Sequence, residues 1–187
     1  MFDKKYPKEI ILKDRTQITL RLLGPQDRDP LVCFYRGMDV AFKWYLKEDP
    51  CDPAVIDKWI DHQLTGRSFA ILACHEDRIV ANAGLLLRPY GARKHIGRLR
   101  IIVVPEFSHK QLGTWMIFDL TKRAMEMELE RIRMDFVVGI DDFAIKAVQK
   151  LDFVKEGLLR DYIQDPDGEY HDYQIMVKKL HKDWSDF

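Results

Sequence analysis

Hydrophobic and polar positions along the chain follow two periods, and each period predicts a different kind of element. Alternation at period two opens the chain at residues 10–23, where Ile18, Leu20 and Leu22 share one face. This segment is either a hairpin or one long bent strand. Residues 69–87 carry two apolar runs separated by a short polar turn, which is typical of an antiparallel hairpin.

Helical spacing appears between these strand segments, at residues 25–38 and 52–64. In the second segment Asp52 is expected to cap the helix, because Pro53 stands at its first position and lacks an amide hydrogen there. Gly66 is expected to end it. The local sequence therefore predicts both ends of this helix.

The second half of the chain alternates strands and helices. It predicts a strand at 98–105, a long amphipathic helix at 112–127, a strand at 133–139, a short helix at 144–151 and a hairpin over 153–180. Parallel neighbours need a helical crossover, whereas hairpins pair antiparallel. The order β, α, α, β, β, β, α, β, α, β, β therefore predicts a mixed α/β sheet with helices on both faces.

Composition adds limits to this picture. The chain has 187 residues, is 47% hydrophobic, and has no internal repeat or linker-like stretch, which predicts one domain over 1–187 with peripheral tails at 1–9 and 181–187. Disorder is excluded as the main description. The 30 basic and 30 acidic residues cancel, so broad electrostatic capture of nucleic acid is not expected.

Cysteine spacing and hydropathy bear on location. Cys33, Cys51 and Cys74 form no close pair, which indicates reduced thiols and neither a disulfide nor a metal framework. No apolar leader or membrane-spanning stretch is recognised. We expect a cytoplasmic protein that binds no metal and no membrane.

The stretch from Ile101 to Met116 predicts a buried strand that leads through a proline-containing loop into the long helix. The first-turn amides of a helix have no intrahelical partner, and the helix dipole adds partial positive charge, so such a junction can hold phosphate. His109 and Lys110 would reinforce it. Most junctions of this kind bind only water, and that alternative stays open at this point.

Three segments together resemble one family. The first runs Ser108, His109, Lys110, Gln111, Leu112, Gly113; the second carries Val138, Asp141, Ala144, Ile145, Val148, Asp152 and Phe153; the third carries Tyr170, Asp172 and Met176. They resemble the pyrophosphate loop R/Q-x-x-G-x-G/A, the V-x-x-N and N-x-x-A-I-x-x-Y-x-x-x-G-F segments, and the closing hairpin of the GNAT superfamily of N-acetyltransferases. The match is to its ribosomal-protein and spermidine acetyltransferase-like branch.

The resemblance implies a fold and a cofactor. The fold would be a GNAT-like mixed, mostly antiparallel twisted sheet of about seven strands flanked by about four helices. Acetyl-CoA would be the cofactor, with CoA as product. The residues at the pantetheine would be Ile102, Val103 and Val104, with Asp141 facing the pantetheine from the neighbouring strand end. The residues at the pyrophosphate would be Ser108, His109, Lys110, Gln111, Leu112, Gly113 and Thr114.

Catalytic positions depart from the family pattern. Val148 stands where the family often has a tyrosine that protonates the leaving thiolate. Gly97 lies near the position where many members have a glutamate that takes the amine proton. Gln111 replaces the middle glycine of the loop, and we expect it in the first helical turn with its side chain outward. The general acid and base are therefore unknown. Weak candidates are Tyr170, His171, Tyr162 and Asn82, each of which also fits a surface or structural hydrogen-bonding role.

Two functions follow as hypotheses. The first is acetyl transfer from acetyl-CoA to a primary amine of a small molecule, polyamine or protein N-terminus, by direct attack in a ternary complex. The second is a non-catalytic acyl-CoA-binding or regulatory module, motivated by Val148 and Gly97. A homodimer is left open.

Basic, aromatic and acidic groups have alternative interpretations. The basic run at 88–100 fits either an anionic partner, RNA included, or a solvated loop, and Arg100 fits a buried or cleft-lining charge with a carboxylate partner. The aromatic residues of 34–45 fit an acceptor wall or core packing, and the aspartates of 49–61 fit a polyamine site or a solvated helix.

Overall fold

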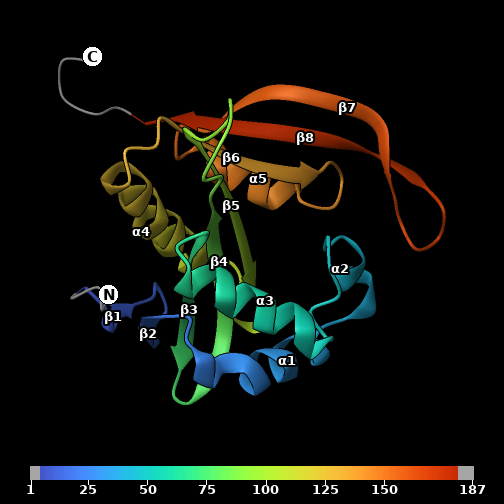
Figure 1. Ribbon diagram of the computed structural model, residues 1–187. Helices are drawn as coiled ribbons and strands as arrows, with labels where there is room; N and C mark the ends of the chain where they lie inside the picture. Colours follow the sequence, from blue (N-terminus) through green and yellow to red (C-terminus); the bar gives the residue numbers. More distant parts are fainter. Residues whose placement is uncertain (1–4, 181–187) are drawn as a thin grey trace. The chain divides into compact units, whose positions relative to one another are not determined.

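The computed structural model describes residues 5–180, which form an α/β fold with a mostly antiparallel sheet. Within this range there are eight strands in the order β1-β2-β3-β4-β5-β6-β8-β7, and five α-helices (Figure 1). The expected fold class is confirmed, with one strand and one helix more than the approximate number. The described chain divides into two compact units, residues 5–86 with 100–120 (unit 1) and residues 87–99 with 121–180 (unit 2).

Unit 1 contains the first half of the chain. Its elements are β1 (Lys8–Ile11), β2 (Gln17–Leu22), the 3₁₀ turn η1 (Pro25–Asp27), α1 (Arg28–Arg36), α2 (Val40–Trp44), α3 (Pro53–Leu64), β3 (Ser68–His75), β4 (Arg78–Leu86) and the 3₁₀ turn η2 (Pro105–Phe107). Two further elements, β5 (Ile96–Val103) and α4 (Leu112–Glu126), begin in one unit and end in the other. Helices α1 and α3 pack on each other and on β4 and β3, respectively (Figure 1).

The opening segment is a hairpin and not one long bent strand, the other form that the alternation allowed. β1 pairs antiparallel with β2, and β2 continues antiparallel to β3. Residues 8 and 9, assigned to the tail in the sequence analysis, lie in this edge strand, while residues 1–4 and 181–187 lie outside the described residues. The hydroxyl of Tyr6 donates to Oδ2 of Asp119 at 3.1 Å, and Lys8 forms an ion pair with the same carboxylate.

Helix α3 begins and ends where local chemistry predicts. The side chain of Asp52 accepts a hydrogen bond from the amide of Ala54 at 2.9 Å, and Pro53 occupies the first helical position. At the other end Gly66 has φ of +71°, the left-handed conformation that terminates helices and that glycine adopts without strain. Helix α2 has no buried residue, and its five residues are too short for a periodic signal, so the sequence did not reveal it.

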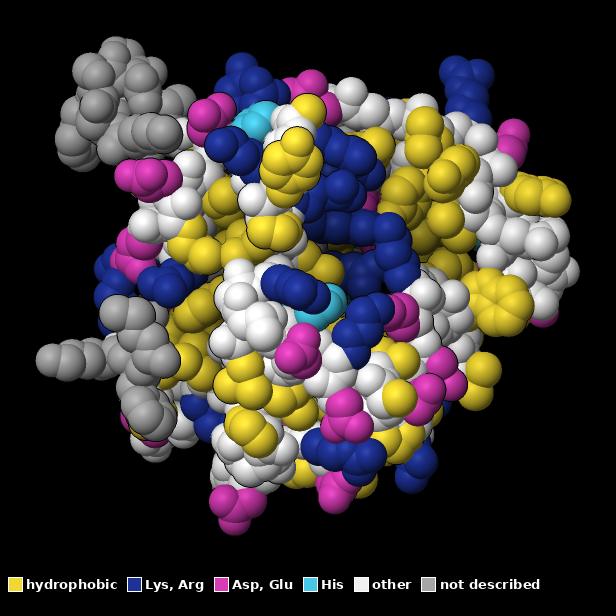
Figure 2. Space-filling view, viewed as in Figure 1, with side chains coloured by type: hydrophobic (Ala, Val, Ile, Leu, Met, Phe, Trp, Pro, Cys, Tyr) yellow, Lys and Arg dark blue, Asp and Glu magenta, His cyan; other side chains and the backbone are white. Residues whose placement is uncertain are grey.

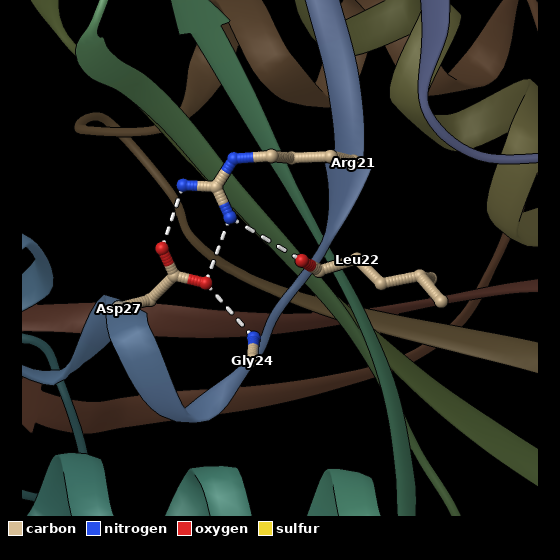
Figure 3. A network of polar contacts seen from close by, with 4 residues as sticks. All are labelled: Arg21, Leu22, Gly24 and Asp27. Atoms are coloured by element: carbon tan, nitrogen blue, oxygen red, sulfur yellow. Dashed lines mark hydrogen bonds and ion pairs between the residues drawn. The ribbon is translucent and has the colours of Figure 1, made fainter. Parts of the chain in front are cut away.

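A buried ion pair joins β2 to the start of α1 (Figure 3). The side chain of Asp27 is 1% exposed and accepts two hydrogen bonds from Arg21, at 2.8 Å and 2.6 Å. The amide of Gly24 donates to the same carboxylate at 2.8 Å. Because the charge is shared by three donors, the carboxylate remains paired although it is out of water.

Unit 2 is built on a crossover and a hairpin. It contains β6 (Arg131–Val137), α5 (Asp142–Gln149), β7 (Val154–Gln164) and β8 (Tyr170–Lys179). The first residues of β5 pair parallel to β6, as the helical connection through α4 requires. β8 lies between β6 and β7 and pairs antiparallel with both, which leaves β7 at the edge. The predicted closing hairpin is thereby confirmed.

Candidate active site

The loop between β5 and α4 has an unusual backbone. His109 and Gln111 have φ of +61° and +70°, a conformation that residues with a Cβ adopt at a cost of about 1–3 kcal/mol. Helix α4 begins at Leu112, so Gln111 precedes the helix. The expectation that Gln111 lies in the first helical turn is therefore wrong. A glycine would adopt this backbone freely, which explains why the motif R/Q-x-x-G-x-G/A has a glycine at the position of Gln111.

The junction offers the backbone amides at the start of α4 as hydrogen-bond donors. The amide of Trp115 donates to the carbonyl of Gln111 at 3.1 Å, and the amides of the three residues before it, Leu112 to Thr114, form the first turn of α4. The hydroxyl of Ser108 donates to the carbonyl of Val104 at 3.3 Å. A Cβ added to Gly113 would meet only Cγ2 of Val103, at 4.0 Å, so steric space does not require glycine there.

Lys110 has a partner within unit 1. Its Nζ lies 2.8 Å from Oδ2 of Asp14 and 5.1 Å from the centre of the Phe107 ring. Hydrogen bonds from Lys110 and Thr16 hold the pKa of the Asp14 carboxyl well below its usual range. The positive charge of Lys110 is thus compensated by Asp14, so the charge available for an anion is smaller than the sequence suggests.

A large pocket, the loop pocket, adjoins this junction within unit 1. Its volume is about 1010 Å³, and it brings together four of the expected cofactor residues, Val103, Val104, Ser108 and His109. The rest of its lining is Pro30, Cys33, Phe34, Gly37, Met38, Asp39, Phe42, Asp77, Arg78, Ile79, Pro105 and Glu106. The size and the apolar wall suit a large amphipathic ligand.

A second, smaller pocket of about 100 Å³ also lies in unit 1 and is called the Asn82 pocket. Its lining is Leu23, Tyr35, Leu46, Glu48, Trp59, His62, Ser68, Ala70, Asn82, Gly84, Leu86, Arg100 and Ile102. Nδ2 of Asn82 donates to the hydroxyl of Tyr35 at 2.9 Å. Burial raises the pKa of Tyr35, so its phenol is neutral at physiological pH. The neutral polar pair lies in a mostly apolar lining, whose other polar members are Glu48, His62, Ser68 and Arg100.

The Asn82 pocket also contains a carboxylate that the sequence did not single out. Oε2 of Glu48 accepts from Nε1 of Trp59 at 3.1 Å, and Oε1 forms an ion pair with Lys58. These contacts with Lys58 and Trp59 lower the pKa of Glu48. No spacing rule marks Glu48, because its partners are 10 and 11 residues away and meet it only when α3 packs. The expectation that Arg100 lines a cleft is confirmed.

Asp141, the expected cofactor residue of unit 2, forms a hydrogen bond with the backbone of a nearby residue in the chain. Its Oδ2 accepts from the amide of Val137 at 2.8 Å, at the end of β6. Burial raises the pKa of this carboxyl. Asp141 therefore orders the turn between β6 and α5.

Val148, where the family often has a tyrosine, is 2% exposed and is part of the core of unit 2.

The three weak catalytic candidates of the β7–β8 hairpin are in different surroundings. His171 lies 2.8 Å from Oδ2 of Asp165, whose pKa is lowered by this contact. Tyr170 and Tyr162 are 63% and 62% exposed. The ring of Tyr162 lies 5.7 Å from that of Tyr173. Of the four candidates, only Asn82 lines either of the two pockets.

Comparisons with known proteins give the family. The family model described as the acetyltransferase (GNAT) family matches residues 34–153. A GNAT acetyltransferase from Streptococcus pneumoniae has a similar structure, with 20% identity over 87% of this chain and 99% of that chain and a TM-score of 0.74. A ribosomal-protein-alanine N-acetyltransferase from Brucella melitensis is 18% identical over 86% and 99%, with a TM-score of 0.75.

A chimeric spermidine N-acetyltransferase from Vibrio cholerae is 17% identical over 87% of this chain and 95% of that chain, with a TM-score of 0.70. No curated protein matches the sequence. No helix among residues 5–180 is long and apolar enough to cross a membrane. The family model covers well over half of the chain and includes β5, the loop and α4. The chain therefore belongs to the GNAT acetyltransferase family.

Proposed function

We propose that this protein transfers the acetyl group of acetyl-CoA to a primary amine, by direct attack while both substrates are bound. The observation that carries the proposal is the position of β5. Arg100 and Ile102 of this strand line the Asn82 pocket, while Val103 and Val104, one and two residues further on, line the loop pocket. The two pockets therefore adjoin the same end of β5, and we assign the cofactor to the loop pocket and the amine to the Asn82 pocket.

The residues of the loop pocket fit acetyl-CoA. Phe34, Met38 and Phe42 offer an apolar wall for the pantetheine arm, and Val103 at the end of β5 and Val104 just after it line the pocket beside them. Asp39, Asp77 and Glu106 in the lining disfavour phosphates beside them, so we assign the pyrophosphate to the backbone amides from Ser108 to Thr114. Two of these residues already have the left-handed backbone of an anion-binding loop. The assignment of Asp141 to the cofactor rests on the sequence alone.

When bound, acetyl-CoA supplies an activated thioester carbonyl. The chain then has to hold the amine, exclude water and orient the attack, and such positioning accounts for a large part of the rate of a bimolecular transfer. Nδ2 of Asn82 is held by Tyr35, which leaves Oδ1 of Asn82 to accept a hydrogen bond from the amine of the acceptor. Neither Asn82 nor the neutral Tyr35 takes up a proton at physiological pH, so we assign removal of the amine proton to another group, either His62 of the same lining or a water molecule.

The lining of the Asn82 pocket favours a compact amine over a polyamine. A polyamine carries several positive charges, and Glu48 is the one carboxylate in this lining, already paired with Lys58. Arg100 adds positive charge on the same wall. The small volume and the apolar side chains suit an amine attached to a short hydrocarbon group, such as the N-terminus of a peptide or a small amino compound.

Cofactor binding is tested by thermal unfolding with and without acetyl-CoA. At about a hundred times the dissociation constant, a bound ligand stabilises the folded state by about 2.7 kcal/mol, which raises Tm by several degrees in a protein of this size. Thr114→Glu should abolish this rise, because the carboxylate repels phosphate at the N-terminus of α4. Its own stability should be unchanged or higher, because a negative charge favours the helix dipole there.

Thr121→Glu, two turns further along α4, is the matched control and should keep the full rise in Tm. An absent rise in the unmodified protein, or an equal rise in both variants, would overturn the assignment of the cofactor to the loop.

Turnover is tested separately by measuring release of free CoA with a panel of amines. We expect the rate with short apolar amines or peptide N-termini to exceed that with spermidine. Cofactor binding without turnover on any amine would favour the non-catalytic acyl-CoA-binding module, for which the buried Val148 is the motivating observation.

A further inference from the structure

Two arginines lie next to each other on one face of the sheet in unit 2. Arg98 of β5 is directly opposite Arg133 of β6 in the parallel register. Asp135 is two residues further along β6 and therefore on the same face. Nε of Arg133 donates to Oδ1 of Asp135 at 2.5 Å, and Arg98 forms an ion pair with Oδ2. One carboxylate thus serves two guanidinium groups.

The group formed by Arg98, Arg133 and Asp135, called the two-arginine cluster, has excess positive charge and unused donors. A guanidinium has five N–H donors. Nη2 of Arg98 also donates to the hydroxyl of Tyr173 at 3.1 Å. Among residues 5–180, Nε of Arg98 is buried without a hydrogen-bond partner, and Oδ2 of Asp135 is buried with only its ion pair to Arg98. Asp135 is 2% exposed, whereas Arg98 and Arg133 are 26% and 32% exposed, so solvent reaches the arginines and not the carboxylate.

An aromatic pair borders the two-arginine cluster. Tyr173 of β8 packs against Tyr162 of β7 with ring centres 5.7 Å apart. Burial, and after it the charge of Asp135, raises the pKa of Tyr173, so this phenol stays a neutral hydrogen-bonding group. Figure 2 shows Lys and Arg side chains gathered beside β6 and below β8, with acidic atoms partly hidden behind them.

We propose that the two-arginine cluster is an oxyanion-binding site, which takes the carboxylate or phosphate group of a small ligand. Planar guanidinium groups match both kinds of oxyanion with paired hydrogen bonds. A singly charged oxyanion would bring the cluster to neutrality and would accept hydrogen bonds from the partly exposed guanidinium groups of Arg98 and Arg133. This site involves residues of unit 2 alone, so it does not depend on the acetyl transfer proposed above.

The test uses the full chain carrying Thr114→Glu, without acetyl-CoA, so that the pyrophosphate site proposed at the loop does not take up the probe. Sodium phosphate and sodium malonate are titrated separately in a calorimeter, at constant ionic strength set with sodium chloride. We expect saturable binding of at least one of them at a single site. Tighter binding of phosphate identifies a phosphate ligand, and tighter binding of malonate identifies a carboxylate ligand. Saturable binding of neither would overturn the proposal.

Three variants separate a built site from general attraction. Arg133→Gln should weaken binding about tenfold or more, because one charge-assisted contact is lost while Asp135 keeps Arg98 as partner. Arg93→Gln, in the exposed loop of the same unit, should leave binding unchanged. Asp135→Asn should strengthen it, since the internal competitor for the two arginines is removed.

An equal loss in the Arg93 and Arg133 variants would overturn the proposal. Weakened or unchanged binding in Asp135→Asn would also do so. Circular dichroism establishes that each variant is folded before titration. If Asp135→Asn does not fold, Arg98→Lys replaces it as the deciding variant. It keeps the charge but loses the planar fork, so it should weaken binding, and unchanged binding would overturn the proposal.

Discussion

The left-handed backbone of Gln111 gives a stability prediction that can be worked out from the structure. At φ of +70° a residue with a Cβ is strained by about 1–3 kcal/mol, and Gln111→Gly removes that strain. Glycine also gives the unfolded chain more freedom, which costs about 0.4–1 kcal/mol. The difference leaves the glycine variant more stable by about 1 kcal/mol. Gln111→Ala keeps the Cβ and should remain close to the unmodified protein.

The measurement is urea-induced unfolding of the three proteins under one set of conditions. Urea unfolding gives the free energy of unfolding directly. In a thermal unfolding experiment, an increase of about 1 kcal/mol would raise Tm by about 2–4 °C for a protein of this size. The alanine variant is the control, since it removes the polar side chain without relieving the backbone. An alanine variant as stable as the glycine variant would refute the claim that the backbone of Gln111 is strained.

Three other predictions concern the buried polar groups. Asp27→Asn should lower the free energy of unfolding by about 2–3 kcal/mol in urea unfolding, below the value for a fully buried pair because the Arg21 side chain is 30% exposed; no loss would contradict it. Burial raises the folded pKa of Asp141, so the folded state disfavours its ionised form at neutral pH; this cost shrinks as pH falls below the folded pKa and is gone below the unfolded pKa. Asp141→Asn should therefore stabilise the protein at neutral pH, by an increment that vanishes in acidic buffer; a pH-independent increment would contradict this. Tyr35→Phe should lower kcat/KM for the amine by about fivefold to tenfold through the lost orientation of Asn82, with the Tm rise from acetyl-CoA unchanged, and steady-state kinetics with thermal unfolding will show whether both hold.

The candidate site was predicted in part. The sequence located the strand, loop and helix that carry the expected cofactor residues, because that segment is continuous in the chain. It did not reveal that Lys110 pairs with Asp14, almost a hundred residues earlier. Nor did it mark Glu48 as part of a pocket, since its hydrogen-bond partner Trp59 reaches it only through the packing of α3.

The sequence by itself determined the order and type of the main elements. Strand alternation, helical spacing and the caps at Asp52 and Gly66 are set by neighbours within a few residues, so they are local properties of the chain. Tertiary structure alone decided the insertion of β8 between β6 and β7 and the pairing of Asn82 with Tyr35. These depend on contacts between distant residues, whose energies exist only after the sheet and its helices have packed.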